Sequence, residues 1–134
     1  MQLLETAALY AGVNILILLV LAVLVIVGRQ RHKIVLGDGG NAEFNRAVRA
    51  HANAAEYTPA ALVGLVTLAL FDPATPVWLI HAAGLSLTVG RLAHAIGLHM
   101  GALNPGRVVG VSLTLLSYLL IGIGLLHAAM TQQL

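Results

Sequence analysis

Residues 3–27 read LLETAALYAGVNILILLVLAVLVIV, an apolar stretch in which Glu5 is the only charged side chain. At about 1.5 Å per residue, a helix of this length crosses a hydrocarbon core of about 30 Å. A signal peptide would carry a basic leader and a shorter apolar core. We therefore predict a retained membrane span and an integral membrane protein.

The composition of the whole chain points the same way. Of its 134 residues, 59% are hydrophobic and only 9% are charged, whereas soluble domains carry about a quarter charged residues. The length suits one membrane domain over residues 1–134. The lack of cysteine excludes disulfides, thiolate metal sites and a cysteine nucleophile. No basic tract with interleaved aromatic residues is present, so we expect no nucleic-acid partner.

Three further segments are long enough to cross the membrane, over residues 42–71, 77–98 and 107–130. The second has a polar first half, and the prolines in residues 72–76 separate it from the third. The connections between the four segments are short, which favours antiparallel neighbours. The sequence therefore predicts an all-α fold, an up-and-down antiparallel bundle of four membrane helices.

The distribution of basic residues predicts the orientation of this bundle. Residues 29–49 contain five basic and two acidic side chains, the second connection carries only Asp72, and the third lies beside Arg107. Lys and Arg accumulate in cytoplasmic loops. We therefore expect the first and third loops in the cytoplasm and both termini on the opposite side of the membrane.

A stripe of polar side chains follows the second predicted helix: Arg46, Arg49, Asn53 and Glu56 lie within about 80° of one another on one face. Ionisable groups at membrane depth usually face a bundle interior or a watery cavity and mark a functional site. Two arginines, an amide and a carboxylate match a zwitterionic ligand. The alternative is a structural salt-bridge network that involves Arg49 and Glu56. Spacing alone leaves both hypotheses open.

Residues 44–59, FNRAVRAHANAAEYTP, resemble the second-helix signature of the MAPEG family, the membrane-associated proteins in eicosanoid and glutathione metabolism. The shared pattern is R-x-x-R-A-x-x-N-x-x-E. The glycine-rich residues 37–40 are similar to the small bacterial branch of this family. Residues 90–94, GRLAH, resemble its third-helix motif, and Arg107 matches the family arginine at the start of the fourth helix.

This resemblance implies a homotrimer in the bacterial inner membrane, with each site shared between neighbouring subunits. It also implies a glutathione transferase or peroxidase that uses glutathione as co-substrate and acts on a lipophilic electrophile or peroxide. The glutathione-binding positions carried over to this sequence are Arg49, Asn53, Glu56, Tyr57, Arg91 and His94. Arg29 or Arg31 would reach a glutathione carboxylate, and Arg107 would be the catalytic residue that stabilises the thiolate.

The chain departs from the family pattern around this catalytic position. Leu98, Val108 and Val111 stand where family branches place a tyrosine or a hydroxyl. These departures favour glutathione binding over glutathione activation. The alternative function is a non-catalytic membrane protein whose polar stripe is structural or binds another anionic ligand.

Two remaining polar features lead to simple expectations. The spacing of the histidines matches no zinc motif, because His94 and His99 are five residues apart and no His-Glu-x-x-His is present. We therefore expect no metal site. Asn14, within the first apolar segment, is expected to form a hydrogen bond between helices.

Overall fold

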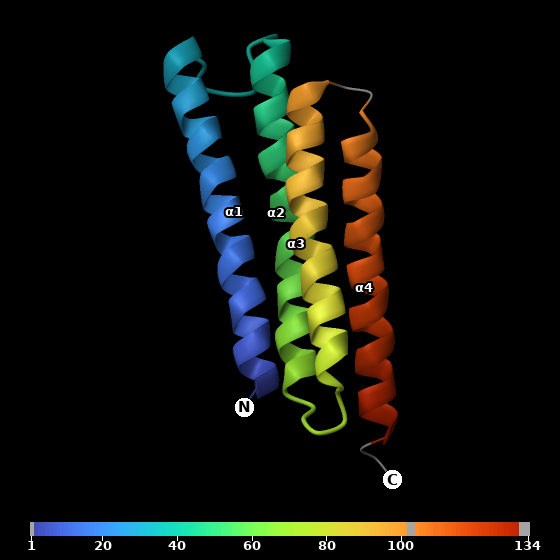
Figure 1. Ribbon diagram of the computed structural model, residues 1–134. Helices are drawn as coiled ribbons and strands as arrows, with labels where there is room; N and C mark the ends of the chain where they lie inside the picture. Colours follow the sequence, from blue (N-terminus) through green and yellow to red (C-terminus); the bar gives the residue numbers. More distant parts are fainter. Residues whose placement is uncertain (1, 102–103, 132–134) are drawn as a thin grey trace.

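The computed structural model describes residues 2–101 and 104–131 and contains four helices (Figure 1). These are α1 (Gln2–His32), α2 (Ala42–Ala69), α3 (Val77–Met100) and α4 (Pro105–Thr131). They run up and down, so that the α1–α2 connection, the end of α3 and the start of α4 lie at one end (Figure 1). The predicted all-α, antiparallel membrane bundle is confirmed. Residues 102–103 of the predicted third turn lie outside the described residues.

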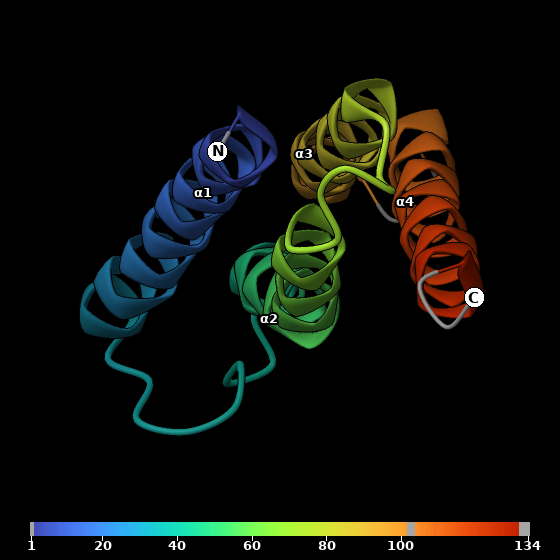
Figure 2. The same cartoon turned by 90° about the horizontal axis from the view of Figure 1, so that it is seen from below.

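The bundle is open rather than square (Figure 2). Helices α2 and α3 pack against each other and form its centre, with α1 against both on one side and α4 against both on the other. Among the described residues, α1 and α4 do not pack together. Helix α2 therefore contacts both α3 and α4, and part of its surface stays exposed on the outside of the bundle.

Local sequence signals set where the helices begin and end. The Asn41 side chain caps α2, because its Oδ1 accepts a hydrogen bond from the backbone N–H of Phe44 at 2.9 Å. Helix α1 continues past its apolar segment through Arg29 to His32, where basic side chains suit the negative end of the helix dipole. Helix α4 begins at Pro105. Proline suits the first position of a helix because it has no backbone N–H, and an N–H at this position would have no partner within the helix.

Three of the helices, α1, α3 and α4, are long and apolar enough to cross a membrane. Helix α2 is as long but falls outside this group because its first half carries the polar stripe. Many large apolar side chains of the other helices, such as Leu9, Leu16 and Leu119, are exposed on the outside of the bundle. This surface is the one that an integral membrane protein presents to lipid.

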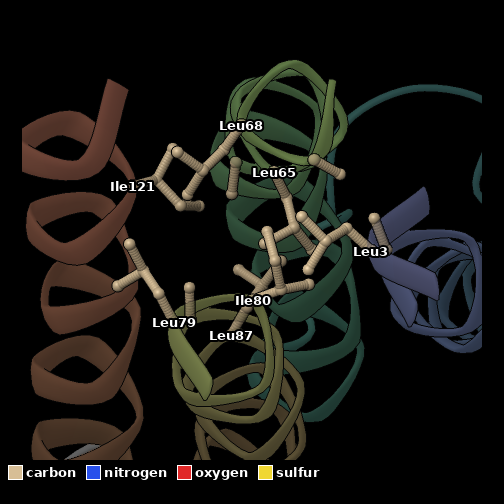
Figure 3. Packing of buried hydrophobic residues seen from close by; sticks show 11 residues of the cluster. Leu3, Leu65, Leu68, Leu79, Ile80, Leu87 and Ile121 are labelled. Atoms are coloured by element: carbon tan, nitrogen blue, oxygen red, sulfur yellow. The ribbon is translucent and has the colours of Figure 1, made fainter. Parts of the chain in front are cut away.

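The larger of two buried apolar clusters joins the second half of α2 to the first half of α3 (Figure 3), and a smaller one that includes Ala50 and Ala54 lies beside the polar stripe. Leu65 and Leu68 of α2 meet Ile80 and Leu87 of α3, and all four side chains are fully buried. Because lipid tails are as apolar as leucine, close packing rather than removal from water stabilises such a core. The core fixes α2 against α3, and the two helices then extend together to the polar end.

The predicted hydrogen bond between helices is confirmed at Asn14. Its side-chain Nδ2 donates to Thr88 Oγ1 at 2.8 Å and to the carbonyl of Tyr10 at 2.9 Å, and the residue is buried. This contact ties α1 to α3 in the middle of the bundle.

We expect a coupling free energy of about 0.6 kcal/mol between Asn14 and Thr88, the mean measured for hydrogen bonds between membrane helices, whose maximum is about 1.7 kcal/mol. A double-mutant cycle of Asn14→Ala and Thr88→Val, followed by denaturant unfolding in detergent, measures it. Additive effects of the two substitutions would contradict the assignment.

Candidate functional site

A cavity of about 330 Å³ lies at the end of the bundle where α2 and α4 begin and α3 ends. Its walls come from three helices. The lining residues are Ala42, Asn45, Arg46, Arg49, Asn53, His94, Leu98 and Arg107. Four of the residues predicted for the site, Arg49, Asn53, His94 and Arg107, are thus brought together around one space.

The α2 wall carries Arg46, Arg49 and Asn53 on successive turns, as the helical period of the stripe predicts. Arg49 is exposed, whereas Arg46 is half-buried and its Nε makes no hydrogen bond within the described part of the chain. Arg46 belongs to the polar stripe but not to the predicted binding residues. Its place in the lining adds a second guanidinium beside Arg49.

The opposite wall is formed where α3 and α4 approach closely. A Cβ atom on Gly97 would lie 2.6 Å from the backbone nitrogen of Arg107, and one on Gly110 would lie 2.5 Å from the backbone nitrogen of His94. Only glycine permits such separations between backbones. The two glycines therefore set how near Arg107 of α4 comes to His94 of α3.

Arg91 of α3 was predicted to bind glutathione together with His94, but it is not among the residues that line the cavity. It contacts Asn53, which is. Only 2% of the surface of Arg91 is exposed. Its Nη1 donates to Asn53 Oδ1 at 2.8 Å and to the Asn53 carbonyl at 3.4 Å, and its Nη2 donates to Thr114 Oγ1. Its guanidinium carbon also lies 5.5 Å from the ring centroid of Tyr57. Arg91 thus contacts the site through Asn53.

Thr114 was not among the predicted site residues. It is buried in α4, where its hydroxyl accepts from Arg91 and donates to the carbonyl of Gly110 at 2.8 Å. A threonine within an apolar span is a signal for a hydrogen bond between helices. That signal does not identify the partner, because the partner depends on how α3 and α4 are aligned.

Four other predicted residues lie outside the cavity of this single chain. Glu56 is exposed near the middle of α2, and Tyr57 is half-buried beside Arg91. Arg29 donates from Nη1 to the carbonyls of Val35 and Gly37 at 3.1 and 3.2 Å, and so fixes the first loop. Arg31 is exposed on the last turn of α1.

The charge of the cavity determines what it can hold. Among the described residues, three arginines, one histidine and two asparagines line it, and no acidic side chain does. Guanidinium groups stay protonated in proteins and bind carboxylates through paired hydrogen bonds. The arrangement is therefore suited to an anion with more than one carboxylate. Within the described ranges, no three His, Asp or Glu side chains gather as a metal site would require.

Comparison with known proteins finds matches that cover most of the chain. The sequence model of the MAPEG family matches residues 7–127. Inner membrane protein YecN of Escherichia coli strain K12 is 37% identical to the chain over 93 residues, which cover 69% of this chain and 70% of YecN. YecN of Escherichia coli O6:H1 matches with the same identity and coverage.

Proposed function

Because the chain belongs to the MAPEG family, we propose that its basic cavity binds glutathione. We propose further that the protein is an enzyme, which conjugates glutathione to a lipophilic electrophile or uses it to reduce a lipophilic peroxide. Glutathione would be the co-substrate, and the second substrate would arrive from the lipid bilayer.

The observation that carries this proposal is the cavity with Arg46, Arg49 and Arg107 in its walls and, within residues 2–101 and 104–131, no acidic lining residue. Glutathione carries two carboxylates, one amine and one thiol. Two guanidinium groups on neighbouring turns of α2 match the carboxylates, and the third, Arg107 of α4, lines the same cavity and would lie beside the sulfur. The volume of 330 Å³ is within the range of about 300–1,000 Å³ typical of small-molecule sites.

The chemistry follows from the charge of Arg107. A free thiol has a pKa of about 8.5, and a nearby cation favours the reactive thiolate. In conjugation, the thiol proton passes to solvent, the sulfur forms a bond to the electrophilic carbon, and the leaving group departs with the bonding electrons. Holding the thiolate beside a substrate dissolved in the membrane replaces a bimolecular encounter by an oriented one. Arg107 would stabilise the negative charge on sulfur until the carbon–sulfur bond forms.

We propose a homotrimer with sites shared between subunits. Glu56 and Arg49 are exposed on the surface of the single chain although α2 packs against the membrane-spanning candidates α1, α3 and α4. Exposed charges at membrane depth are expensive, and a neighbouring subunit would cover them. Such a neighbour would also be the means by which Arg29 or Arg31 reaches a glutathione carboxylate.

The proposed location is the bacterial inner membrane, with the cavity open to the cytoplasm. YecN is an inner membrane protein by name. The basic residues Arg29, Arg31 and Lys33 lie at the same end as the cavity, and such residues mark cytoplasmic loops. Both termini would then lie on the opposite side, and glutathione would enter from the cytoplasm.

Arg49→Ala is expected to weaken glutathione binding by about 10- to 100-fold, because a charge-assisted hydrogen bond contributes about 1.5–3 kcal/mol. Calorimetric titration of the purified protein in detergent measures the change. The matched control is Lys33→Asn, which removes one positive charge at the same end but outside the cavity. Lys33 has a φ of 55°, a conformation that asparagine tolerates.

The same titration separates the proposed function from a structural role of the stripe. A binding site predicts that Arg49→Ala loses affinity and keeps the oligomer seen for the wild-type protein by light scattering. If Arg49→Ala instead breaks the oligomer, and the wild-type protein does not bind glutathione, the stripe serves packing and the proposal is wrong.

A further inference from the structure

We propose that Arg91 is a positioning residue that fixes the orientation of the Asn53 side-chain amide. In this orientation the NH2 group of Asn53 faces the cavity, so this part of the site selects a hydrogen-bond acceptor, such as a ligand carboxylate. The inference rests on the proposed glutathione site and adds to it the reason for its selectivity at Asn53.

The orientation follows from the donors and acceptors involved. A guanidinium group has five N–H donors and no acceptor, and an amide side chain has one acceptor oxygen. The contact of 2.8 Å between Arg91 Nη1 and the Asn53 side chain must therefore be made by Oδ1. The reversed amide would place two donors against each other. Because Asn53 also lines the cavity, its Nδ2 is the polar group left for a ligand.

Arg91 is itself held so that it cannot release the amide easily. Its second nitrogen donates to Thr114 Oγ1, whose own hydrogen is engaged by the Gly110 carbonyl at 2.8 Å. The backbone carbonyl of Asn53 gives a further contact at 3.4 Å, and the Tyr57 ring lies on one side. The guanidinium is thus hydrogen-bonded to both α2 and α4, and it holds the side-chain oxygen of Asn53 in place.

The positive charge of Arg91 is not paired with a carboxylate in any of its hydrogen bonds within the described residues, so it can polarise Asn53. Those hydrogen bonds go to the neutral oxygens of Asn53 and Thr114. A hydrogen-bonded chain of this kind polarises its members, so the outer N–H groups of Asn53 become better donors. Because Arg91 is only 2% exposed, it acts on the ligand through Asn53 rather than by contact. A ligand amine is disfavoured here and must lie elsewhere in the site.

The first variant is Asn53→Asp. The new carboxylate keeps an acceptor for Arg91 and gains an ion pair with it, but it has no N–H to offer the ligand. We expect the dissociation constant for glutathione to rise by about tenfold or more, while the melting temperature of the protein stays unchanged or increases. The new carboxylate also repels a ligand carboxylate, so the part played by Arg91 is measured by the variants of Arg91 itself.

Two variants of Arg91 complete the test. Arg91→Met frees the amide to turn, so the affinity for glutathione should fall, whereas Arg91→Lys keeps a donor-only cation and should restore part of it. If the wild-type protein binds glutathione and Asn53→Asp or Arg91→Met binds it equally well, the inference is wrong and the proposed function stands. If the wild-type protein does not bind glutathione, both are wrong.

Discussion

Arg107→Gln is expected to reduce the turnover number for glutathione conjugation by about 10²- to 10³-fold, the loss typical of removing one group that stabilises developing or fixed negative charge. Glutamine keeps hydrogen-bond donors at this position but carries no charge. The glutathione thiol would return to a pKa near 8.5, and the thiolate fraction at neutral pH would fall. Affinity for glutathione should change little, because Arg46 and Arg49 still face the cavity.

The measurement is the rate of conjugation to a soluble aromatic electrophile as a function of pH. For the wild-type protein we expect a rate that is already high near neutral pH. For Arg107→Gln the rate should increase as the pH rises toward the ordinary pKa of the thiol. Val108→Ala is the matched control, because Val108 is the next residue and is 68% exposed. An unchanged turnover in Arg107→Gln would exclude thiolate stabilisation by Arg107.

Gly110→Val is expected to destabilise the bundle by more than about 3 kcal/mol, beyond the usual range for overpacking. A Cβ on Gly110 would lie 2.5 Å from the backbone nitrogen and 2.7 Å from the Cα of His94, and 2.7 Å from the carbonyl oxygen of Gly90. These are backbone atoms, which cannot move aside by changing a rotamer. Helices α3 and α4 would have to separate, and His94 would move away from Arg107.

Gly122→Val is the matched control for this prediction. It lies on the same helix, and a Cβ there would meet no atom within 4 Å. Its effect on the free energy of unfolding should stay within about 0.5 kcal/mol, as for ordinary surface changes. Thermal unfolding in detergent compares the two variants. Equal melting temperatures would mean that the close approach of α3 and α4 does not contribute to stability.

The fold could be predicted from the sequence because its signals are local. The apolar run of residues 3–27 and the Asn41 cap each depend on a few neighbouring residues. An asparagine within an apolar span predicts a hydrogen bond between helices, but its partner, Thr88 of α3, is set by the packing of the bundle. The end of α1 was less apparent, because hydropathy marks the span in lipid and not the polar last turn that continues to His32.

The candidate site was only partly predictable for a physical reason. Helical periodicity gives the face on which a side chain lies, which brought Arg49 and Asn53 together. It does not give the depth of a residue or its partner. Arg91 and His94 are three residues apart on one face of α3, yet only His94 lines the cavity, because Asn53 separates Arg91 from it. The placement of Glu56 outside the cavity likewise depends on packing.

The most direct test of the glutathione site is a structure of the purified protein, determined in lipid with saturating glutathione. The proposal predicts a trimer with glutathione in each basic cavity, a carboxylate against Arg49 and the NH2 group of Asn53, and sulfur beside Arg107. A cavity without glutathione, in which Glu56 of a neighbouring copy pairs with Arg49, would contradict it and would make the stripe a packing device.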